Sequence, residues 1–135
     1  MKRMRGVTLI ELMTVVTIIG ILAAVAYPAY VEQARRGRRA AAVAMLQNVL
    51  QQSERFYSEN NTYTTDLTAL GYPAGAVYSE HNTHTIALVA GPTGDITTSV
   101  KITATPVAAD AKCTEISLTS TNKRDATGSD ISVCW

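Results

Sequence analysis

The stretch VTLIELMTVVTIIGILAAVA, residues 7–26, decides the fold of this chain. It holds 20 residues, and Glu11 is the only charged side chain between residue 7 and Val31. A helix of that length crosses a hydrocarbon core of roughly 30 Å. Basic side chains at positions 2, 3 and 5 precede it. The positive-inside rule therefore predicts that its N-terminal end stays in the cytoplasm and that its C-terminal part faces outward.

A cleaved secretory signal peptide is the alternative for this segment. Ala24-Val25-Ala26 has the small-residue pattern of a cleavage site. However, the apolar run is longer than the ~7–15 residues of a signal-peptide core. A carboxylate such as Glu11 also costs roughly 2.5–3.5 kcal/mol at mid-membrane, a cost for which a disposable segment has no physical need. The residues therefore favour a helix that is retained.

Met1–Gly6, followed by Val7–Leu12 and the long apolar run, closely resembles the class III signal of type IV pilins. That family has a short basic leader ending in glycine, a hydrophobic first mature residue and a glutamate as the fifth mature residue. The resemblance implies that a prepilin peptidase cuts between Gly6 and Val7 and methylates the new amine of Val7. It also implies an assembly role for Glu11, which would pair with the amine of a neighbouring subunit. The first mature residue of the family is usually phenylalanine. Valine at that position, as in Val7, is tolerated more often in minor pilins than in major ones.

The helix is predicted to run from Val7 to about Ser58. In its second half, apolar residues recur at the threes and fours that line one helical face: Val43, Leu46, Val49, Leu50, Phe56 and Tyr57. Gly20 weakens the first half, and Pro28 lacks the N–H that would bond the carbonyl of Ala24, so a kink is expected there. The resemblance adds partial melting between these positions during assembly.

The remaining residues predict a small sheet. A loop over 57–73 resembles the αβ-loop of PilE-like pilins, and its large side chains are expected to pin it to the sheet: Tyr63, Leu67, Leu70 and Tyr72. Strands are predicted over 85–90, 98–105, 115–121 and 130–135, with a turn over 122–129.

The expected fold is therefore α+β: one long N-terminal helix packed on a C-terminal four-stranded antiparallel sheet. The expected organisation is a leader peptide at 1–6, a transmembrane and polymerisation helix at 7–31, and a head domain at 32–135.

Cys113 and Cys134 are the two cysteines, and their spacing fits no metal motif. They would form one disulfide in an exported chain and two buried thiols in a cytosolic chain. In the pilin family a matching pair defines the C-terminal D-region, and a terminal Cys-Trp such as Cys134-Trp135 recurs in PilE-like members of type IVa. The resemblance therefore implies a disulfide.

Few residues suggest chemistry. The formal charge of +1 indicates no charged partner. His81 and His84 are interpreted as solvated loop histidines, because no further ligand cluster lies near them. No catalytic, cofactor or metal site is expected. The four arginines within 35–39 are interpreted as a solvated helix face that meets neighbouring subunits or lipid headgroups, with nucleic-acid contact as the weaker alternative.

We expect a structural subunit of a type IV pilus, in particular a minor pilin that serves adhesion, twitching motility or DNA uptake. Two alternatives stay open: a pseudopilin of a type II secretion system, and a DNA-uptake receptor pilin. The expected partners are other pilin subunits, prepilin peptidase, the inner-membrane assembly machinery and the membrane itself. The subunit would be a single-pass inner-membrane protein with a periplasmic head, and later part of the surface pilus.

Overall fold

The computed structural model describes residues 6–75, 77–128 and 130–135. The chain divides into two compact units, Met1–Ala34 and Arg35–Trp135. Residues 9–34 are called the apolar segment below, and Arg35–Trp135 the head.

One helix, α1, spans Leu9–Asn60 and contributes to both units. It holds 52 residues, and it begins and ends two residues later than the sequence predicted. It continues through Gly20, and Pro28 lies inside it. The kink and the melting at these positions stay predictions.

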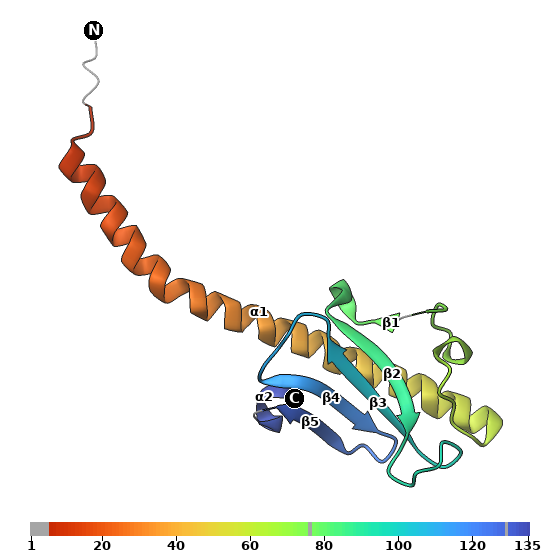
Figure 1. Cartoon of the computed structure of the whole chain (residues 1–135). Coiled ribbons are helices and arrows are strands. Elements are labelled where there is room, and N and C mark those ends of the chain that lie inside the picture. The colour runs from red at the N-terminus through yellow and green to blue at the C-terminus, as the bar shows by residue number, and fades with distance from the viewer. Residues whose placement is uncertain (1–5, 76, 129) are drawn as a thin grey trace. The chain divides into compact units, whose positions relative to one another are not determined.

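The head packs a five-stranded sheet on its part of α1 (Figure 1). The strands follow one another in chain order, and each pair is antiparallel. The strands are β1 (Val77–Tyr78), β2 (His84–Ala90), β3 (Val100–Pro106), β4 (Cys113–Thr119) and β5 (Arg124–Gly128). Three short helices complete the head: η1 (Leu67–Leu70), η2 (Glu80–Asn82) and α2 (Ile131–Cys134).

The sheet differs from the prediction in three places. It has five strands rather than four, because the short β1 pairs with β2 and the predicted turn over 122–129 contains β5. β5 has little strand propensity of its own, and its pairing with β4 defines it. The predicted last strand over 130–135 is wrong: the Asp130 carboxylate accepts the Ser132 N–H at 2.9 Å and caps α2.

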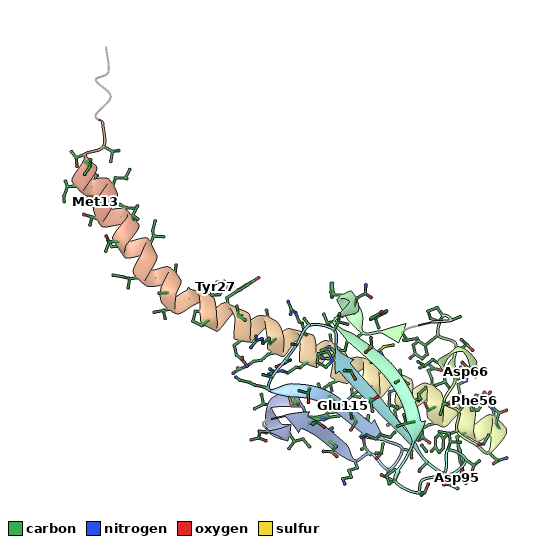
Figure 2. All side chains as sticks on the ribbon, in the orientation of Figure 1. Met13, Tyr27, Phe56, Asp66, Asp95 and Glu115 are labelled. Carbon is green, nitrogen blue, oxygen red and sulfur yellow. A yellow bond between two sulfur atoms is a disulfide. The ribbon has the colours of Figure 1, made fainter. Side chains whose placement is uncertain are left out.

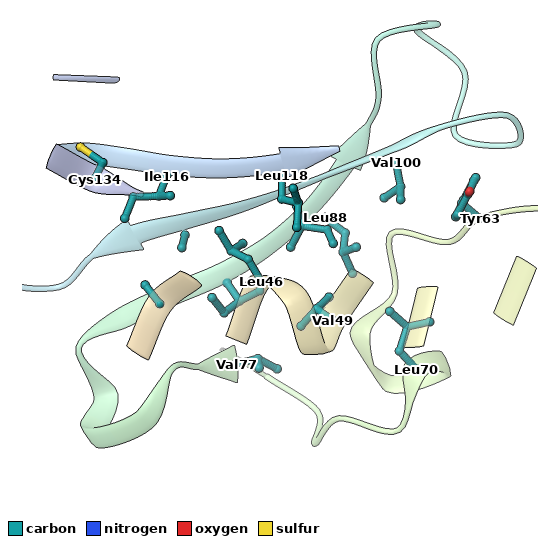
Figure 3. Close-up of a cluster of buried hydrophobic side chains, with 14 of the residues drawn as sticks. Leu46, Val49, Tyr63, Leu70, Val77, Leu88, Val100, Ile116, Leu118 and Cys134 are labelled. Atoms are coloured by element: carbon teal, nitrogen blue, oxygen red, sulfur yellow. The ribbon is translucent and has the colours of Figure 1, made fainter. Parts of the chain in front are cut away.

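The core lies between α1 and the sheet. Figure 3 shows Leu46 and Val49 of α1 facing Leu88 of β2 and Leu118 of β4. The buried row on α1 is Arg39, Ala42, Leu46, Val49 and Ser53. Spacings of three and four place these side chains on one helical face, as predicted for Leu46 and Val49.

The loop after α1 closes one side of this core. Tyr63 and Leu70 are buried in it, and Leu67 and Tyr72 pack against it, which confirms the predicted pinning. The Tyr63 ring also stacks on Tyr57 with 4.5 Å between centroids.

Candidate functional site

The predicted processing site lies at the start of α1. Gly6 and Val7 precede the helix, and both are exposed. Glu11 lies in the first turn, where the helix dipole favours a carboxylate. Its backbone N–H donates to the Thr8 hydroxyl at 3.3 Å. Val7 is thus not part of the regular helix in the uncleaved chain, so the helix does not fix how its backbone nitrogen lies relative to Glu11.

The apolar segment exposes its side chains on all sides (Figure 2). Every residue from Gly6 to Tyr30 is exposed, and the large aliphatic ones range from 50% at Val15 to 78% at Leu9. The most apolar window of α1 has a mean hydropathy of 2.4, so by length and composition this helix can cross a membrane. Tyr27 and Tyr30 lie at the C-terminal end of the exposed apolar run, and aromatic residues are enriched at membrane interfaces.

Arg39 and Asp110 form a buried ion pair in the head. The guanidinium donates from Nε to Asp110 Oδ2 at 2.7 Å and from Nη2 to Oδ1 at 2.9 Å. Its Nη1 also donates to the Val133 carbonyl at 3.4 Å, and the Lys112 N–H donates to Asp110 Oδ1 at 3.1 Å. The hydrogen bond from Arg39 lowers the pKa of Asp110 despite its burial. Arg39 thus joins α1 to the β3–β4 loop and to α2.

This pair corrects the interpretation of the arginine block as one solvated face. Arg39 is 2% exposed, whereas Arg36 and Arg38 are exposed and Arg35 is half-buried. The buried row on α1 begins at Arg39, three residues before Ala42. Extending the apolar stripe backwards by that spacing would have indicated which arginine faces the sheet. The partner, Asp110, had no sequence signal.

A groove of about 350 Å³ lies beside this pair. It is called the arginine groove below, and its lining is Arg35, Arg38, His81, Asn82, Thr83, His84 and 106–110. His84 was expected to be a solvated loop residue, but it is 2% exposed at the first position of β2. Burial lowers the pKa of its imidazole; the Asp110 carboxylate opposes this shift, and the Arg38 and Arg39 charges add to it. The alternation His84, Ile86, Leu88 was the signal that this side chain points inward.

The C-terminal region is fixed by several contacts. Cys113 and Cys134 form a disulfide with 5.7 Å between Cα atoms, as the resemblance implied. The Trp135 indole N–H donates to the Asp125 carbonyl at 2.9 Å. The Arg124 guanidinium lies 5.3 Å from the centre of that indole ring, within cation–π range. The terminal residue therefore holds β5 as well as α2.

Lys123 and Arg124 are exposed beside the turn between β4 and β5. The turn is closed by Asn122 N–H to Thr119 O at 2.8 Å and Thr119 N–H to Lys123 O at 3.1 Å. No pattern in the sequence singled out these two cations. Among the described residues neither side chain forms an ion pair, unlike Lys101, which lies 3.5 Å from Glu115.

In the part of the chain that the structure describes, no group of three or more His, Cys, Asp or Glu side chains is placed to hold a metal ion.

Two comparisons with known families cover most of the chain. Residues 28–117 match the family described as type IV minor pilin ComP, DNA uptake sequence receptor. Residues 1–27 match the prokaryotic N-terminal methylation motif. No curated protein matches this chain. Since the first match spans more than half of the sequence, the chain belongs to the ComP family of type IV minor pilins.

The chain is therefore a structural subunit of a type IV pilus, which assembles with other pilins. The pseudopilin alternative is not supported. The methylation motif and the exposed apolar helix fit a subunit that is first anchored in a membrane and then built into a pilus.

Proposed function

We propose that this minor pilin is a DNA receptor, displayed on the pilus by its head. The match to a DNA-uptake-sequence receptor family over 28–117 carries the proposal, because it includes most of the head. The 18 residues beyond that span, 118–135, are argued from the structure alone.

The contact surface we propose is Lys123 and Arg124, together with the turn that precedes them. Exposed cations neutralise phosphates, and hydroxyls and backbone N–H groups add positioning contacts. The turn supplies the hydroxyls of Ser120 and Thr121 and the side-chain amide of Asn122. The indole of Trp135 holds the Arg124 guanidinium in place, so less side-chain freedom is lost on binding.

Fluorescence anisotropy of the full-length chain in detergent with labelled duplex DNA tests this proposal. We expect affinity to fall steeply with salt, and the double variant Lys123→Gln/Arg124→Gln to reduce the slope of log K against log salt by about 2. Arg55→Gln is the matched control, since Arg55 is exposed on α1 and lies 3.3 Å from its own partner Glu59. The DNA-receptor proposal fails if the wild-type chain does not bind duplex DNA. Binding with an unchanged slope in the double variant would instead place the DNA surface elsewhere.

The N-terminal steps belong to the same proposal. Prepilin peptidase cuts between Gly6 and Val7 and methylates Val7, and the inner-membrane assembly machinery then inserts the subunit into the filament. Residues 7–31 span the membrane beforehand, and residues 32–135, which include the head, lie in the periplasm. Three observations support this: the motif match over 1–27, the exposure of the cleavage site and the length of the apolar run.

We propose that Glu11 favours incorporation of the subunit into the filament over its membrane-anchored state. A lone carboxylate on an apolar helix is unfavourable in lipid unless it is paired. It has no cationic side chain nearby on its own helix, where the next basic residue is Arg35. Pairing in trans with the Val7 amine of a neighbouring subunit would neutralise both charges and set the register of otherwise featureless helices. Pairing within one chain is the competing arrangement.

A further inference from the structure

The arginine groove has a net positive lining. Its cations are Arg35 and Arg38, and its one carboxylate, Asp110, is already paired. Both Asp110 oxygens accept from Arg39, and one also accepts the Lys112 N–H. The groove therefore presents two guanidinium groups to a ligand without a competing anion of its own. That arrangement suits a phosphate group, which arginine binds through paired N–H donors.

The loop that lines the groove at residues 81–84 is held by hydrogen bonds. His81 and Asn82 have positive φ angles of 59° and 54°, which is uncommon for consecutive residues other than glycine. Hydrogen bonds fix them from both sides: Ser79 N–H donates to His84 O at 2.8 Å, and His84 N–H donates to Ser79 Oγ at 3.0 Å. The Val107 N–H also holds this loop by donating to Thr83 O at 2.9 Å.

One lining residue, His84, also carries a buried polar atom. His84 is 2% exposed, and its Nε2 atom has no hydrogen-bond partner among the described residues. An unpaired buried nitrogen is costly in a folded chain unless a ligand or water satisfies it. The groove is thus a built site with a hydrogen-bonded loop, two cations and one unsatisfied polar group.

The chain itself places this groove close to lipid. Arg35 follows Tyr30 by five residues, so no more than about 18 Å of chain separates them even when extended. Tyr27 and Tyr30 are both more than 70% exposed at the end of the apolar run, as residues of a membrane interface are. The positive-inside rule disfavours arginines on the translocated side of a membrane helix. A ligand that neutralises Arg35 and Arg38 would offset this unfavourable placement.

We propose that the arginine groove binds the phosphate headgroup of an anionic phospholipid while the subunit is still in the membrane. Basic clusters next to a membrane-spanning helix recognise such headgroups through their charge. Leaving the membrane for the filament would then require release of that lipid. The proposal is independent of DNA binding, because Lys123 and Arg124 lie at the far end of β4 from the β3–β4 loop. β4 has seven residues and so spans roughly 20 Å.

Native mass spectrometry of the full-length chain released from nanodiscs tests the proposal. The discs are phosphatidylcholine with a minor fraction of phosphatidylglycerol, and the measured quantity is the phosphatidylglycerol retained per chain as that fraction is varied. We expect wild type to retain it in preference to phosphatidylcholine. Arg35→Gln/Arg38→Gln should weaken retention about 30-fold, which corresponds to roughly 1 kcal/mol per arginine. Arg55→Gln, which removes an exposed arginine of α1 outside the groove, should change it less than twofold.

Each other outcome overturns the proposal. Equal retention by wild type and the double variant removes the groove from lipid binding. An equal loss in Arg55→Gln shows a general effect of charge. Displacement of the lipid by millimolar glycerol phosphate assigns the groove to a free phosphate, and displacement by duplex DNA assigns it to nucleic acid. Thermal unfolding of all three proteins verifies that the substitutions leave the head folded.

Discussion

The apolar segment and the head differ in whether their apolar side chains are buried within the chain. From Leu9 to Tyr30 every side chain is exposed, whereas the head encloses a continuous core on its own. The segment therefore leaves its apolar surface for lipid or for other subunits to cover, while the head needs no partner to cover its core. The difference fits two tasks along one helix: association, proposed above for residues 9–34, and packing against the sheet by residues 35–60.

The charged residues of the two regions differ in the same way. Glu11, the acidic residue of the first turn, is exposed, and its proposed partner is the Val7 amine of a neighbouring subunit. Arg39, only 28 residues further along, is buried and has its partner within the head. Changes in the first region should therefore affect assembly and leave folding intact, and changes in the second should do the reverse.

The largest effect is expected from Glu11→Ala. It should reduce the amount of this subunit in isolated filaments to near background, because trans pairing with the Val7 amine is lost. Membrane insertion and head stability should stay unchanged, since removing a charge makes insertion easier. Quantitative immunoblotting of sheared filaments and membranes measures both pools. Thr17→Ala, which also removes a polar group from this helix, is the control. Normal filament levels with Glu11→Ala would eliminate the trans-pairing mechanism.

Arg39→Ala should have the largest effect on folding. It leaves Asp110 buried without its cation, a change that typically costs ~3–5 kcal/mol. Urea unfolding of the full-length chain in detergent measures it through the fluorescence of Trp135, the only tryptophan. Arg38→Ala, an exposed neighbour, should stay within about 0.5 kcal/mol of wild type. Similar losses from the two variants would contradict the assignment of Arg39 as the buried partner.

Cys134→Ser should destabilise the head by ~2–5 kcal/mol, the usual effect of removing a native disulfide from a small exported domain. The same urea experiment measures the loss, and reduced wild type should behave like the variant. Insertion of the apolar segment into the membrane should not change. Peptide mapping without reductant provides a separate check, and two free thiols in native protein would contradict the structure.

The smallest effect is a pH dependence. The pKa of His84 is lowered in the folded head, so the unfolded chain binds the proton more readily and stability should fall as the pH drops below about 6.5. The loss from this group is at most about 2 kcal/mol at pH 5. The pKa of Asp110 is lowered as well, and its contribution is lost only below its ordinary value of 3.8. The difference in unfolding free energy between pH 7 and pH 5 should shrink in His84→Asn, and an unchanged difference would assign it to another group.

The sequence predicted most of the fold because its strongest patterns are local. The apolar run, the stripe through Leu46 and Val49, and the alternation in β2 to β4 depend on neighbouring residues, and the structure contains them. β5 was missed because Arg-Asp-Ala-Thr-Gly resembles a turn and becomes a strand only by pairing with β4. α2 was missed because Ile-Ser-Val-Cys alternates like a strand until Asp130 caps it.

The head sites were harder to predict for a different reason. The Arg39–Asp110 pair joins residues 71 positions apart, and no local pattern relates them. The arginine groove likewise gathers the start of the head helix with two loops that follow β1 and β3. Only the tertiary structure separates the buried arginine from the exposed ones. The N-terminal motif, in contrast, lies within eleven residues and could be identified from sequence alone.

Intact-mass analysis of this chain, recovered from sheared surface filaments, tests most directly whether the two regions divide the work of a pilin. We expect a mature chain that begins at Val7, carries one added methyl group and retains the Cys113–Cys134 bond. It should be present in small amounts relative to the main filament subunit, as a minor pilin is. A chain that begins at Tyr27, having lost the apolar segment, or the absence of this chain from filaments, would contradict the account.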